Sequence, residues 1–220
     1  VCDGGNADQD CAGVCFGDTV VDECGDCGGS GAEEGFDCAG NCVDAAVCGS
    51  VALSFGAVSD QSAEVLYSSN FDIGGFQFDT DGVDLTGVSS DLGDATFSSA
   101  TGIVIGFSFT GGSLPAGDGV LAIISFAPTN NGSSLSAGSV TVSSADGVTL
   151  ASSGPGSTTT DGCYETDCAG VCYGDAQDLA CGCNDADSCN DCADVPNGDS
   201  WESDCGCVAA DNSGDDCDDC

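Results

Sequence analysis

The positions of the cysteines constrain this chain more than any other feature. Eight of its 19 cysteines lie within residues 1–48 and eleven within residues 163–220, whereas residues 49–162 contain none. Cysteines at this density are typical of secreted domains held together by disulfides and are rare in cytosolic proteins. We therefore expect an extracellular or cell-surface protein with two disulfide-rich arms. Between the arms, the sequence predicts a cysteine-free domain at residues 49–151 and a Ser/Gly/Thr-rich linker at residues 152–162.

The charge of the chain excludes several classes of partner. It carries 38 Asp and Glu but no Lys, Arg or His, which gives a formal net charge of −38. Nucleic-acid phosphates are contacted mainly by Lys and Arg, and anionic membrane surfaces attract basic segments, so we expect neither partner. No apolar run approaches the ~18 residues of a membrane-spanning helix, so we expect no membrane insertion. Cations from the solvent must balance the carboxylates, which makes metal ions the natural ligands.

The composition also argues against an enzyme. Without His, Lys or Arg, the chain lacks the usual general base, the Schiff-base amine and the cation that stabilises an oxyanion. Paired carboxylates can hydrolyse glycosides, and Asp72, Asp79, Asp81 and Asp84 lie close together in the sequence. A hairpin turn at residues 79–82 explains this group better, so we expect no catalytic residues.

The arms contain an internal repeat. Residues 10–18 (Asp-Cys-Ala-Gly-Val-Cys-Phe-Gly-Asp) return as residues 167–175 with one substitution, and in a looser form as residues 191–199. A fourth, shorter copy starts at residues 37–42. Another Asp and a close cysteine pair follow each of the first three copies, so the unit spans roughly two dozen residues. These units have too few apolar residues to fold by burial, and covalent and metal cross-links must replace a core.

The repeated carboxylates predict calcium as a cofactor. Calcium takes six to eight oxygen ligands, and glycine permits the tight turns around it. Carboxylates recur at equivalent positions of each repeat, which favours metal ligands over the alternative of a solvated acidic surface. The Cys-x-x-Cys pairs have a spacing that suits zinc, but the density of cysteines and the acidic excess favour disulfides and calcium. The candidate calcium ligands are Asp10, Asp18, Asp22, Asp37, Asp44, Asp167, Asp175, Asp178, Asp185, Asp187, Asp191, Asp199, Asp204, Asp211 and Asp215.

The repeats also predict local disulfides. We expect each set of four cysteines to form two bridges among its own members, with the connectivity inside each set left open. The sets are Cys11, Cys15, Cys24 and Cys27; Cys168, Cys172, Cys181 and Cys183; and Cys189, Cys192, Cys205 and Cys207. The shorter copy supplies Cys38, Cys42 and Cys48, which lack a fourth partner until Cys163. That count predicts a disulfide clamp that joins the two ends of the central domain.

The central domain has the pattern of short β-strands. Apolar and polar residues alternate in six segments, which turn signals such as Asp81-Gly82 and Asn131-Gly132 separate. Strands at this spacing, without helical periodicity, predict an antiparallel, all-β sandwich of roughly nine strands with a core of its own. The six segments are residues 51–55, 64–67, 75–78, 103–109, 120–126 and 140–142.

Three stretches of the central domain carry a resemblance. Residues 72–79 (Asp-Ile-Gly-Gly-Phe-Gln-Phe-Asp), 113–121 and 142–147 resemble cohesin domains, the jelly-roll-like sandwiches of bacterial scaffolding proteins. The resemblance implies a cohesin-like, jelly-roll-like fold for about a hundred residues. Cohesins bind dockerins, but this sequence offers no residue to which a dockerin contact can be assigned.

The arms carry a second resemblance. Asp-Cys-Ala-Gly at residues 10–13, 37–40 and 167–170 is similar to repeats of large secreted proteins of environmental bacteria. More loosely, the arms resemble the type 3 repeats of thrombospondins, in which Asp-rich loops wrap calcium between disulfides. The Asp-x-Asp-x-Asp-Gly string of those repeats is absent, and residues 185–187 and 211–215 come nearest to it. This resemblance implies irregular, metal-stabilised arms.

These observations lead to two hypotheses about function. The first is a calcium-stabilised structural unit of an extracellular fibre, sheath or adhesin stalk, which assembles with copies of itself. The alternative is a carbohydrate- or protein-binding module of the cohesin docking type on a rigid stalk. Both ends of the sequence stop within a repeat, so we expect residues 1–220 to be one segment of a longer chain. One sequon, Asn131-Gly132-Ser133, makes Asn131 a candidate for an N-linked glycan.

Overall fold

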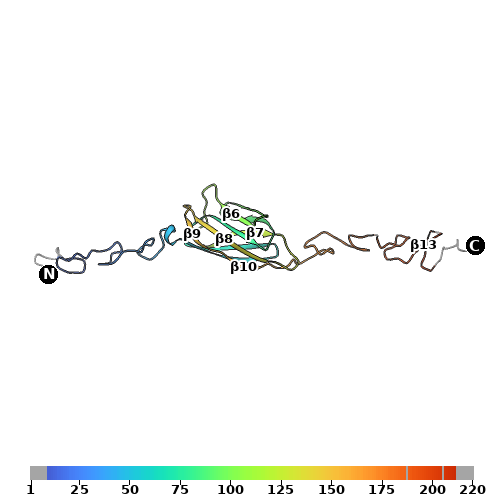
Figure 1. The fold of residues 1–220 in the computed structure, drawn as a ribbon, viewed down its shortest axis with the longest axis horizontal. Helices are drawn as coiled ribbons and strands as arrows, with labels where there is room; N and C mark the ends of the chain where they lie inside the picture. Colours follow the sequence, from blue (N-terminus) through green and yellow to red (C-terminus); the bar gives the residue numbers. More distant parts are fainter. Residues whose placement is uncertain (1–8, 187, 205, 212–220) are drawn as a thin grey trace, which may run out of the picture. The chain divides into compact units, whose positions relative to one another are not determined.

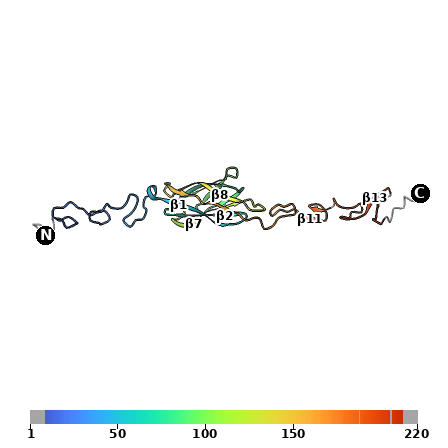
Figure 2. The same cartoon turned by 60° about the horizontal axis from the view of Figure 1, so that its bottom comes forward.

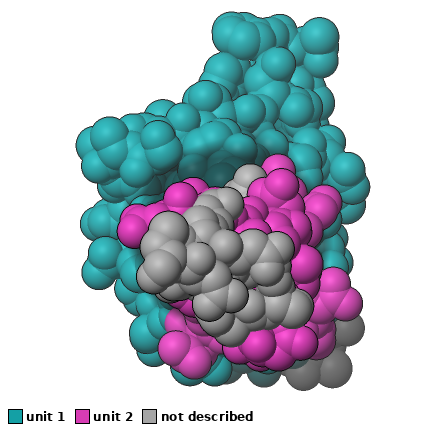
Figure 3. All heavy atoms as spheres, turned by 90° about the vertical axis from the view of Figure 1, so that its right-hand side faces the viewer, with its two compact units in different colours: residues 1–127, 133–161 teal, residues 128–132, 162–220 magenta. Residues whose placement is uncertain are grey.

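The computed structural model describes residues 9–186, 188–204 and 206–211, which Figure 1 shows as a ribbon. The chain divides into two compact units, drawn in separate colours in Figure 3. The first comprises residues 1–127 and 133–161, and the second comprises residues 128–132 and 162–220. Residues 128–132 therefore group with the C-terminal arm rather than with the strands on either side of them.

The first unit contains a ten-stranded sheet, which a single helical turn, α1 (Ala45–Cys48), precedes. Side chains of β2 and β6 alternate between buried and more accessible positions, because successive residues of a strand point to opposite faces. The strands are β1 (Ser50–Val58), β2 (Ser62–Ser69), β3 (Ile73–Asp81), β4 (Leu85–Ser89), β5 (Asp94–Phe97), β6 (Ile103–Phe107), β7 (Gly117–Phe126), β8 (Ser134–Ser144), β9 (Thr149–Ser153) and β10 (Gly156–Thr159).

The sheet curls into a nearly closed sandwich. Its strand order is β4-β7-β2-β1-β9-β8-β3-β6-β5, and β10 pairs with β8. Strand β9 joins the two halves, because it pairs in parallel with β1 and antiparallel with β8. Figure 2 turns the sandwich by 60° and labels β1 and β2 beside β7. The fold class predicted from the sequence, an all-β jelly-roll-like sandwich flanked by irregular disulfide-rich arms, is confirmed.

The core lies between the two halves of the sandwich. Phe76 and Phe78 are two residues apart on β3 and both point inward, with ring centroids 5.9 Å apart in a stacked arrangement. Val65 and Val104 contribute fully buried side chains from β2 and β6. The core formed by the described residues contains no cysteine. Burial of apolar surface therefore holds the sandwich together without help from a disulfide.

We expect Phe78→Ala to destabilise the sandwich by about 3–5 kcal/mol, because it leaves a cavity in a packed core. Phe78 is 1% exposed, whereas Phe109, in the loop after β6, is 82% exposed and provides the matched control. Denaturant unfolding followed by near-UV circular dichroism would measure both variants. Equal losses for Phe78→Ala and Phe109→Ala would contradict the assignment of this core.

Two details of the central domain differ from expectation. Residues 156–159 were expected in a flexible linker but form β10, which pairs with β8 through Thr158 and Leu135. Small polar side chains suit such a strand because its backbone groups are paired while its side chains stay exposed. Strand β3 also continues through Asp81, so the turn expected at residues 79–82 starts later. Asp79 instead accepts a hydrogen bond from the Gly138 N–H at 3.1 Å.

The arms have little regular structure. In the C-terminal arm, β11 (Asp178–Leu179) pairs with β12 (Gly182–Cys183), and β13 (Trp201–Ser203) pairs with β14 (Gly206–Val208). Within the described part of both arms, Val208 is the one buried hydrophobic side chain. The arms therefore depend on disulfides and local hydrogen bonds. None of the helices in the described residues has the length and apolar character that a membrane crossing needs.

Candidate functional site: aspartate-anchored disulfide loops

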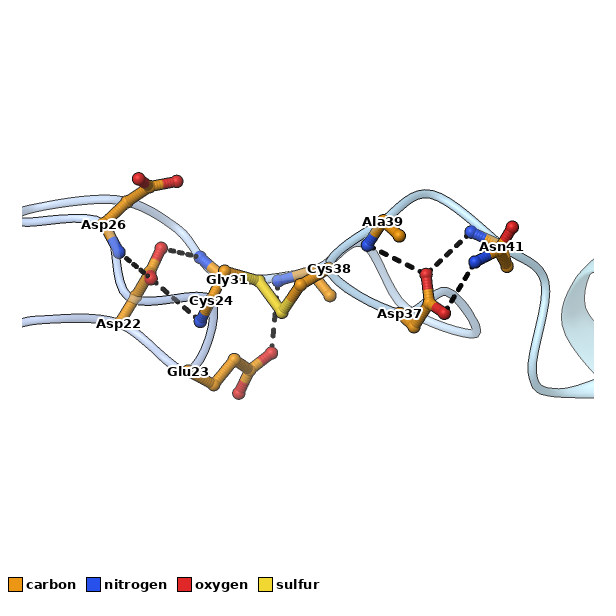
Figure 4. Close-up of a disulfide and its surroundings, with 10 residues drawn as sticks. Asp22, Glu23, Cys24, Asp26, Gly31, Asp37, Cys38, Ala39 and Asn41 are labelled. Atoms are coloured by element: carbon orange, nitrogen blue, oxygen red, sulfur yellow. Dashed lines mark hydrogen bonds between the residues drawn. A yellow bond between two sulfur atoms is a disulfide. The ribbon is translucent and has the colours of Figure 1, made fainter.

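One aspartate organises each loop of the arms, and Figure 4 shows the arrangement around Asp22. Its Oδ1 accepts hydrogen bonds from the backbone N–H groups of Cys24 at 3.0 Å and Asp26 at 2.8 Å. Its Oδ2 accepts a hydrogen bond from the Gly31 N–H at 2.8 Å. The backbone closes around the carboxylate, since the Asp22 N–H donates to the Asp26 carbonyl at 2.9 Å. One side chain thus satisfies three backbone donors of an irregular segment.

The same loop occurs five times in the described residues. In every copy, Oδ1 accepts a hydrogen bond from the backbone N–H four residues later, at 2.7 to 3.0 Å. In four copies, Oδ2 accepts from the N–H nine residues later. In the shorter copy, the Asn41 side chain donates to Oδ2 of Asp37 at 2.8 Å instead. The five anchoring residues are Asp10, Asp22, Asp37, Asp167 and Asp191.

Two glycines explain the sequence of the repeat. The first, three residues after the anchor, has a positive φ, which glycine adopts without steric cost. It is Gly13, Gly25, Gly40 or Gly170, with φ of 80°, 90°, 83° and 78°. The second, seven residues after the anchor, leaves room for the carboxylate, since a Cβ there would collide with Oδ2 of the anchor. It is Gly17, Gly29, Gly174 or Gly198. The spacing Asp-x-x-Gly-x-x-x-Gly of the loops anchored by Asp10, Asp22 and Asp167 therefore follows from the loop geometry. In the loop anchored by Asp191, Asp194 takes the place of the first glycine with a φ of 61°.

The loop anchored by Asp22 is a copy that sequence comparison missed. The sequence pattern predicts that Asp22 is an additional ligand of the repeat that begins at Asp10. In the structure, Asp22 begins a loop of its own, with the same hydrogen bonds as Asp10. Gly25 and Gly29, three and seven residues after Asp22, were the signal that identifies it. The repeating structural element of this arm is therefore a single anchored loop, shorter than the unit of roughly two dozen residues.

Hydrogen bonding lowers the pKa of all five anchoring carboxyl groups below their ordinary value. The largest cause in each case is the hydrogen bond donated by the residue four positions later, because it stabilises the charged form. For Asp37, that bond comes from the Asn41 side chain, and for the other four it comes from a backbone N–H. Partial desolvation raises the pKa by a smaller amount.

These pKa shifts predict how the loops respond to acid. A carboxyl group with a lowered pKa in the folded state stabilises the fold above its unfolded pKa, and this stabilisation is lost as the pH falls through the folded pKa. We therefore expect the loops to stay intact down to the ordinary pKa of 3.8 and to loosen below it. Hydrogen exchange of the Val14 and Val171 amides across a pH series would measure this. Loss of protection well above that pH, with the sandwich amides unchanged, would contradict it.

Disulfides link neighbouring loops, and we call the seven disulfides whose two cysteines both lie within the described residues the disulfide ladder. Four of them have similar sequence separations of 14 to 16 residues. Cys15 is also disulfide-bonded, and Cys205 lies outside the described residues. The seven pairs are Cys11–Cys27, Cys24–Cys38, Cys42–Cys48, Cys163–Cys172, Cys168–Cys183, Cys181–Cys189 and Cys192–Cys207.

The pairing expected within each set of four cysteines is right for one bridge per set, namely Cys11–Cys27, Cys168–Cys183 and Cys192–Cys207, and wrong for the other bridges that the structure describes. Cys24 bonds to Cys38 of the next loop, as Figure 4 shows. The expected clamp across the sandwich is also wrong, because Cys48 bonds to Cys42 and Cys163 bonds to Cys172. The physical reason is that each anchored loop turns back on itself, so its cysteines meet those of the adjacent element. The zinc alternative fails for Cys24 and Cys27, which belong to two different disulfides.

The candidate calcium ligands fall into distinct structural roles. The five anchors accept backbone hydrogen bonds, Asp44 caps α1 by accepting from the Ala46 N–H at 2.9 Å, and Asp185 accepts from the Ser188 N–H at 2.8 Å. Asp187 and Asp215 lie outside the described residues. Within those residues, no group of three or more His, Cys, Asp or Glu is arranged to hold a metal ion, and calcium binding by these aspartates stays a prediction. The exposed candidates are Asp18, Asp175, Asp178, Asp199, Asp204 and Asp211.

Asn131, the candidate for glycosylation, lies in a tight turn between β7 and β8. The Gly132 N–H donates to the Thr129 carbonyl at 3.3 Å, and the Asn131 side chain is exposed. The turn leaves the amide accessible, and a glycan there stays a prediction.

Comparison with known proteins finds similarity in structure only. No protein-family model matches the chain, and no curated protein matches it. One similar solved structure is the non-cellulosomal cohesin from the hyperthermophilic archaeon Archaeoglobus fulgidus. It is 16% identical with a TM-score of 0.37, over 52% of this chain and 91% of that one. A type I cohesin from a cohesin–dockerin complex of Clostridium thermocellum is 12% identical with a TM-score of 0.38, over 54% of this chain and 97% of that one. At these identities the likeness concerns the fold alone.

Proposed function

We propose that this chain is a non-enzymatic structural protein of an extracellular assembly. The arms serve as stalk or spacer segments, and the sandwich serves as a packing module between copies of the protein. The disulfide ladder is the observation that carries this proposal. It gives shape to two segments that have almost no buried apolar side chain, and persistent disulfides are a property of extracellular proteins.

The ladder suits a segment that transmits mechanical load. Cys24 lies inside the loop that Cys11–Cys27 closes, and its own disulfide reaches Cys38 beyond that loop. The two disulfides overlap, so every peptide bond between residues 11 and 38 is bypassed by a covalent cross-link. Three overlapping disulfides do the same between residues 163 and 189. Tension on such a segment is carried by covalent bonds, and its extension is limited by the closed loops.

Calcium enters this proposal as a counter-ion. The chain has a formal net charge of −38 and no basic side chain, so copies of it repel one another until cations neutralise the exposed carboxylates. Asp18, Asp175 and Asp199 are exposed at the same position of three repeats and are available to bind cations. Extracellular calcium modules bind the ion with dissociation constants of about 10⁻⁴–10⁻³ M. We therefore expect millimolar calcium to neutralise the exposed carboxylates.

We expect the purified full chain to assemble into regular fibres or sheets when millimolar calcium is added, because calcium removes the repulsion between copies. Sedimentation velocity and negative-stain electron microscopy, with calcium and with excess chelator, would measure this. Sodium chloride at matched ionic strength is the control that separates general screening from binding of a divalent ion.

The outcomes distinguish the two parts of the proposal. A chain that stays monomeric in calcium and in salt would contradict a structural function. Equal assembly in calcium and in matched sodium chloride would keep the structural function and reject the role of calcium.

A binding module is a second candidate, and an apolar stripe along β6 supports it. Ile103, Ile105 and Phe107 point to the outer face of the sandwich, opposite Asp79, Gln77 and Gly75 of β3, and are only partly buried. Phe109 extends the stripe, with its ring packed edge-on against Phe107 at a centroid distance of 4.7 Å. Exposed aromatic and branched side chains of this kind are typical of protein-binding surfaces.

The sandwich has its own cysteine-free core, so residues 49–161 can be tested by themselves. For a binding module, this fragment would retain a protein or glycan ligand of the extracellular medium, and Ile105→Asp would abolish retention. A structural module would retain no ligand as an isolated fragment.

A further inference from the structure

The disulfide ladder joins cysteines that are not nearest neighbours in the sequence. Six of the seven pairs skip at least one intervening cysteine, and Cys42–Cys48 is the exception. Several pairs also interlock, since Cys168–Cys183 encloses one partner of Cys163–Cys172 and one partner of Cys181–Cys189. Such a pattern cannot form by joining each cysteine to the next one along the chain.

Direct oxidation of the unfolded chain favours other pairs. The probability that two residues of a flexible chain meet falls with the length of the loop between them. Cys11 is four residues from Cys15 but 16 residues from its partner Cys27. The dependence of loop closure on loop length predicts that Cys11 meets Cys15 about eightfold more often than it meets Cys27. Cys24 is likewise three residues from Cys27, but its partner is Cys38. Early oxidation is therefore expected to form Cys11–Cys15 and Cys24–Cys27.

The chain is poorly suited to correct these pairs by itself. Exchange requires a thiolate, which neighbouring cations stabilise and neighbouring anions destabilise. No Lys, Arg or His exists anywhere in the sequence to stabilise one. An acidic residue directly precedes many arm cysteines, as in Asp10-Cys11, Glu23-Cys24, Asp26-Cys27, Asp37-Cys38, Asp167-Cys168 and Asp191-Cys192. Intramolecular exchange is accordingly slow.

We propose that the ladder is reached by thiol–disulfide exchange with a dithiol isomerase whose substrate-binding surface is cationic. The thiolate of the partner attacks Sγ of Cys11 in a Cys11–Cys15 bridge, the bridge breaks, and Cys15 leaves as a thiolate that takes up a proton. A second partner thiolate attacks Sγ of Cys24 in the Cys24–Cys27 bridge and sets Cys27 free as a thiolate. Cys27 then attacks Sγ of Cys11 in the first mixed disulfide, the Cys38 thiolate attacks Sγ of Cys24 in the second, and each attack releases a partner as a thiolate. This exchange has no net oxidation, and a disulfide-donating oxidant accepts two electrons for each bridge when the cysteines are first oxidised.

The charge of the chain selects the partner. A polyanion is attracted to a cationic surface and repelled by an acidic one, and this changes the rate of encounter. The arm cysteines lie in segments that have almost no buried apolar side chain, so mispaired bridges remain accessible. The anchored loops then determine which disulfide pairs remain after exchange. Their hydrogen bonds form only when the cysteines of adjacent loops are free to meet. This inference is independent of the proposed function, since a binding module would need the same disulfides.

The test is to refold the reduced full chain along two routes. In the first route, an oxidant acts without free thiol. In the second, redox couples of matched potential and matched thiolate concentration supply the exchange, one cationic (cysteamine and cystamine) and one anionic (glutathione). Disulfides are mapped by mass spectrometry after digestion at Asp and Glu, because trypsin has no site in a chain without Lys or Arg.

We expect oxidation without thiol to trap Cys11–Cys15 and Cys24–Cys27. We expect the cationic couple to produce the ladder roughly tenfold faster than the anionic couple at low salt. This difference should disappear at 1 M salt, where the screening length falls to about 3 Å. Asp26→Asn is a matched variant that removes a charge beside Cys27 and should speed the anionic couple. Formation of the ladder without thiol would overturn the need for exchange, and equal rates with both couples would overturn the cationic surface.

Discussion

Reduction of the disulfides is expected to unfold both arms while the sandwich stays folded. Each disulfide that spans 14 to 16 residues stabilises the folded state by about 3 kcal/mol, because it lowers the entropy of the unfolded chain. The described residues of the arms bury Val208 and almost no other apolar side chain, so nothing replaces that contribution. The sandwich core contains no cysteine and keeps its apolar contacts.

Hydrogen exchange read out by mass spectrometry would measure this effect. After reduction and capping of the thiols, peptides from residues 10–48 and 163–211 should exchange at the rate of an unfolded chain. Peptides from β2 and β3 should keep their protection, which makes them the internal control. Arms that stay protected after complete reduction would show that another interaction holds them. A sandwich that unfolds with the arms would show that the two depend on each other.

Asp167→Ala is expected to open its loop and to disturb the disulfides around it. The variant removes the acceptor for the N–H groups of Ala169 at 3.0 Å, Val171 at 2.8 Å and Ala176 at 3.2 Å. Charge-assisted hydrogen bonds are the stronger class, so we expect these three amides to exchange roughly tenfold faster or more. The fraction of chains with the correct Cys168–Cys183 bridge should fall as well, because the loop brings those cysteines together.

Asp175→Ala is the matched control for this variant. Asp175 has the same side chain in the same repeat, but it is exposed. The substitution should leave the three amides and the disulfide unchanged. Asp167→Asn keeps one oxygen acceptor and should give an intermediate effect. If Asp175→Ala damaged the loop as much as Asp167→Ala, the net charge of the repeat would matter more than the anchoring hydrogen bonds.

The sequence alone determined the class of the central fold. Alternation of apolar and polar residues located strands such as β2 and β6, because side chains of a half-buried strand must alternate between core and solvent. The density of cysteines and the shortage of apolar residues identified the arms as disulfide-stapled. These conclusions depend on local pattern and composition, which a single sequence contains in full.

The tertiary structure decided which strands pair, which groups the aspartates bind and which cysteines are partners. Residues 156–159 look like a linker, and only the presence of β8 as a partner makes them a strand. Sequence spacing does not show that Asp22 turns its carboxylate toward its own backbone, and calcium binding by the aspartates of the repeat stays a prediction. The cysteine partners were likewise assigned by counting within repeats, whereas Cys24 meets Cys38. A disulfide forms between sulfurs that the fold brings within bonding distance, and that distance depends on the loop conformation and not on separation along the chain.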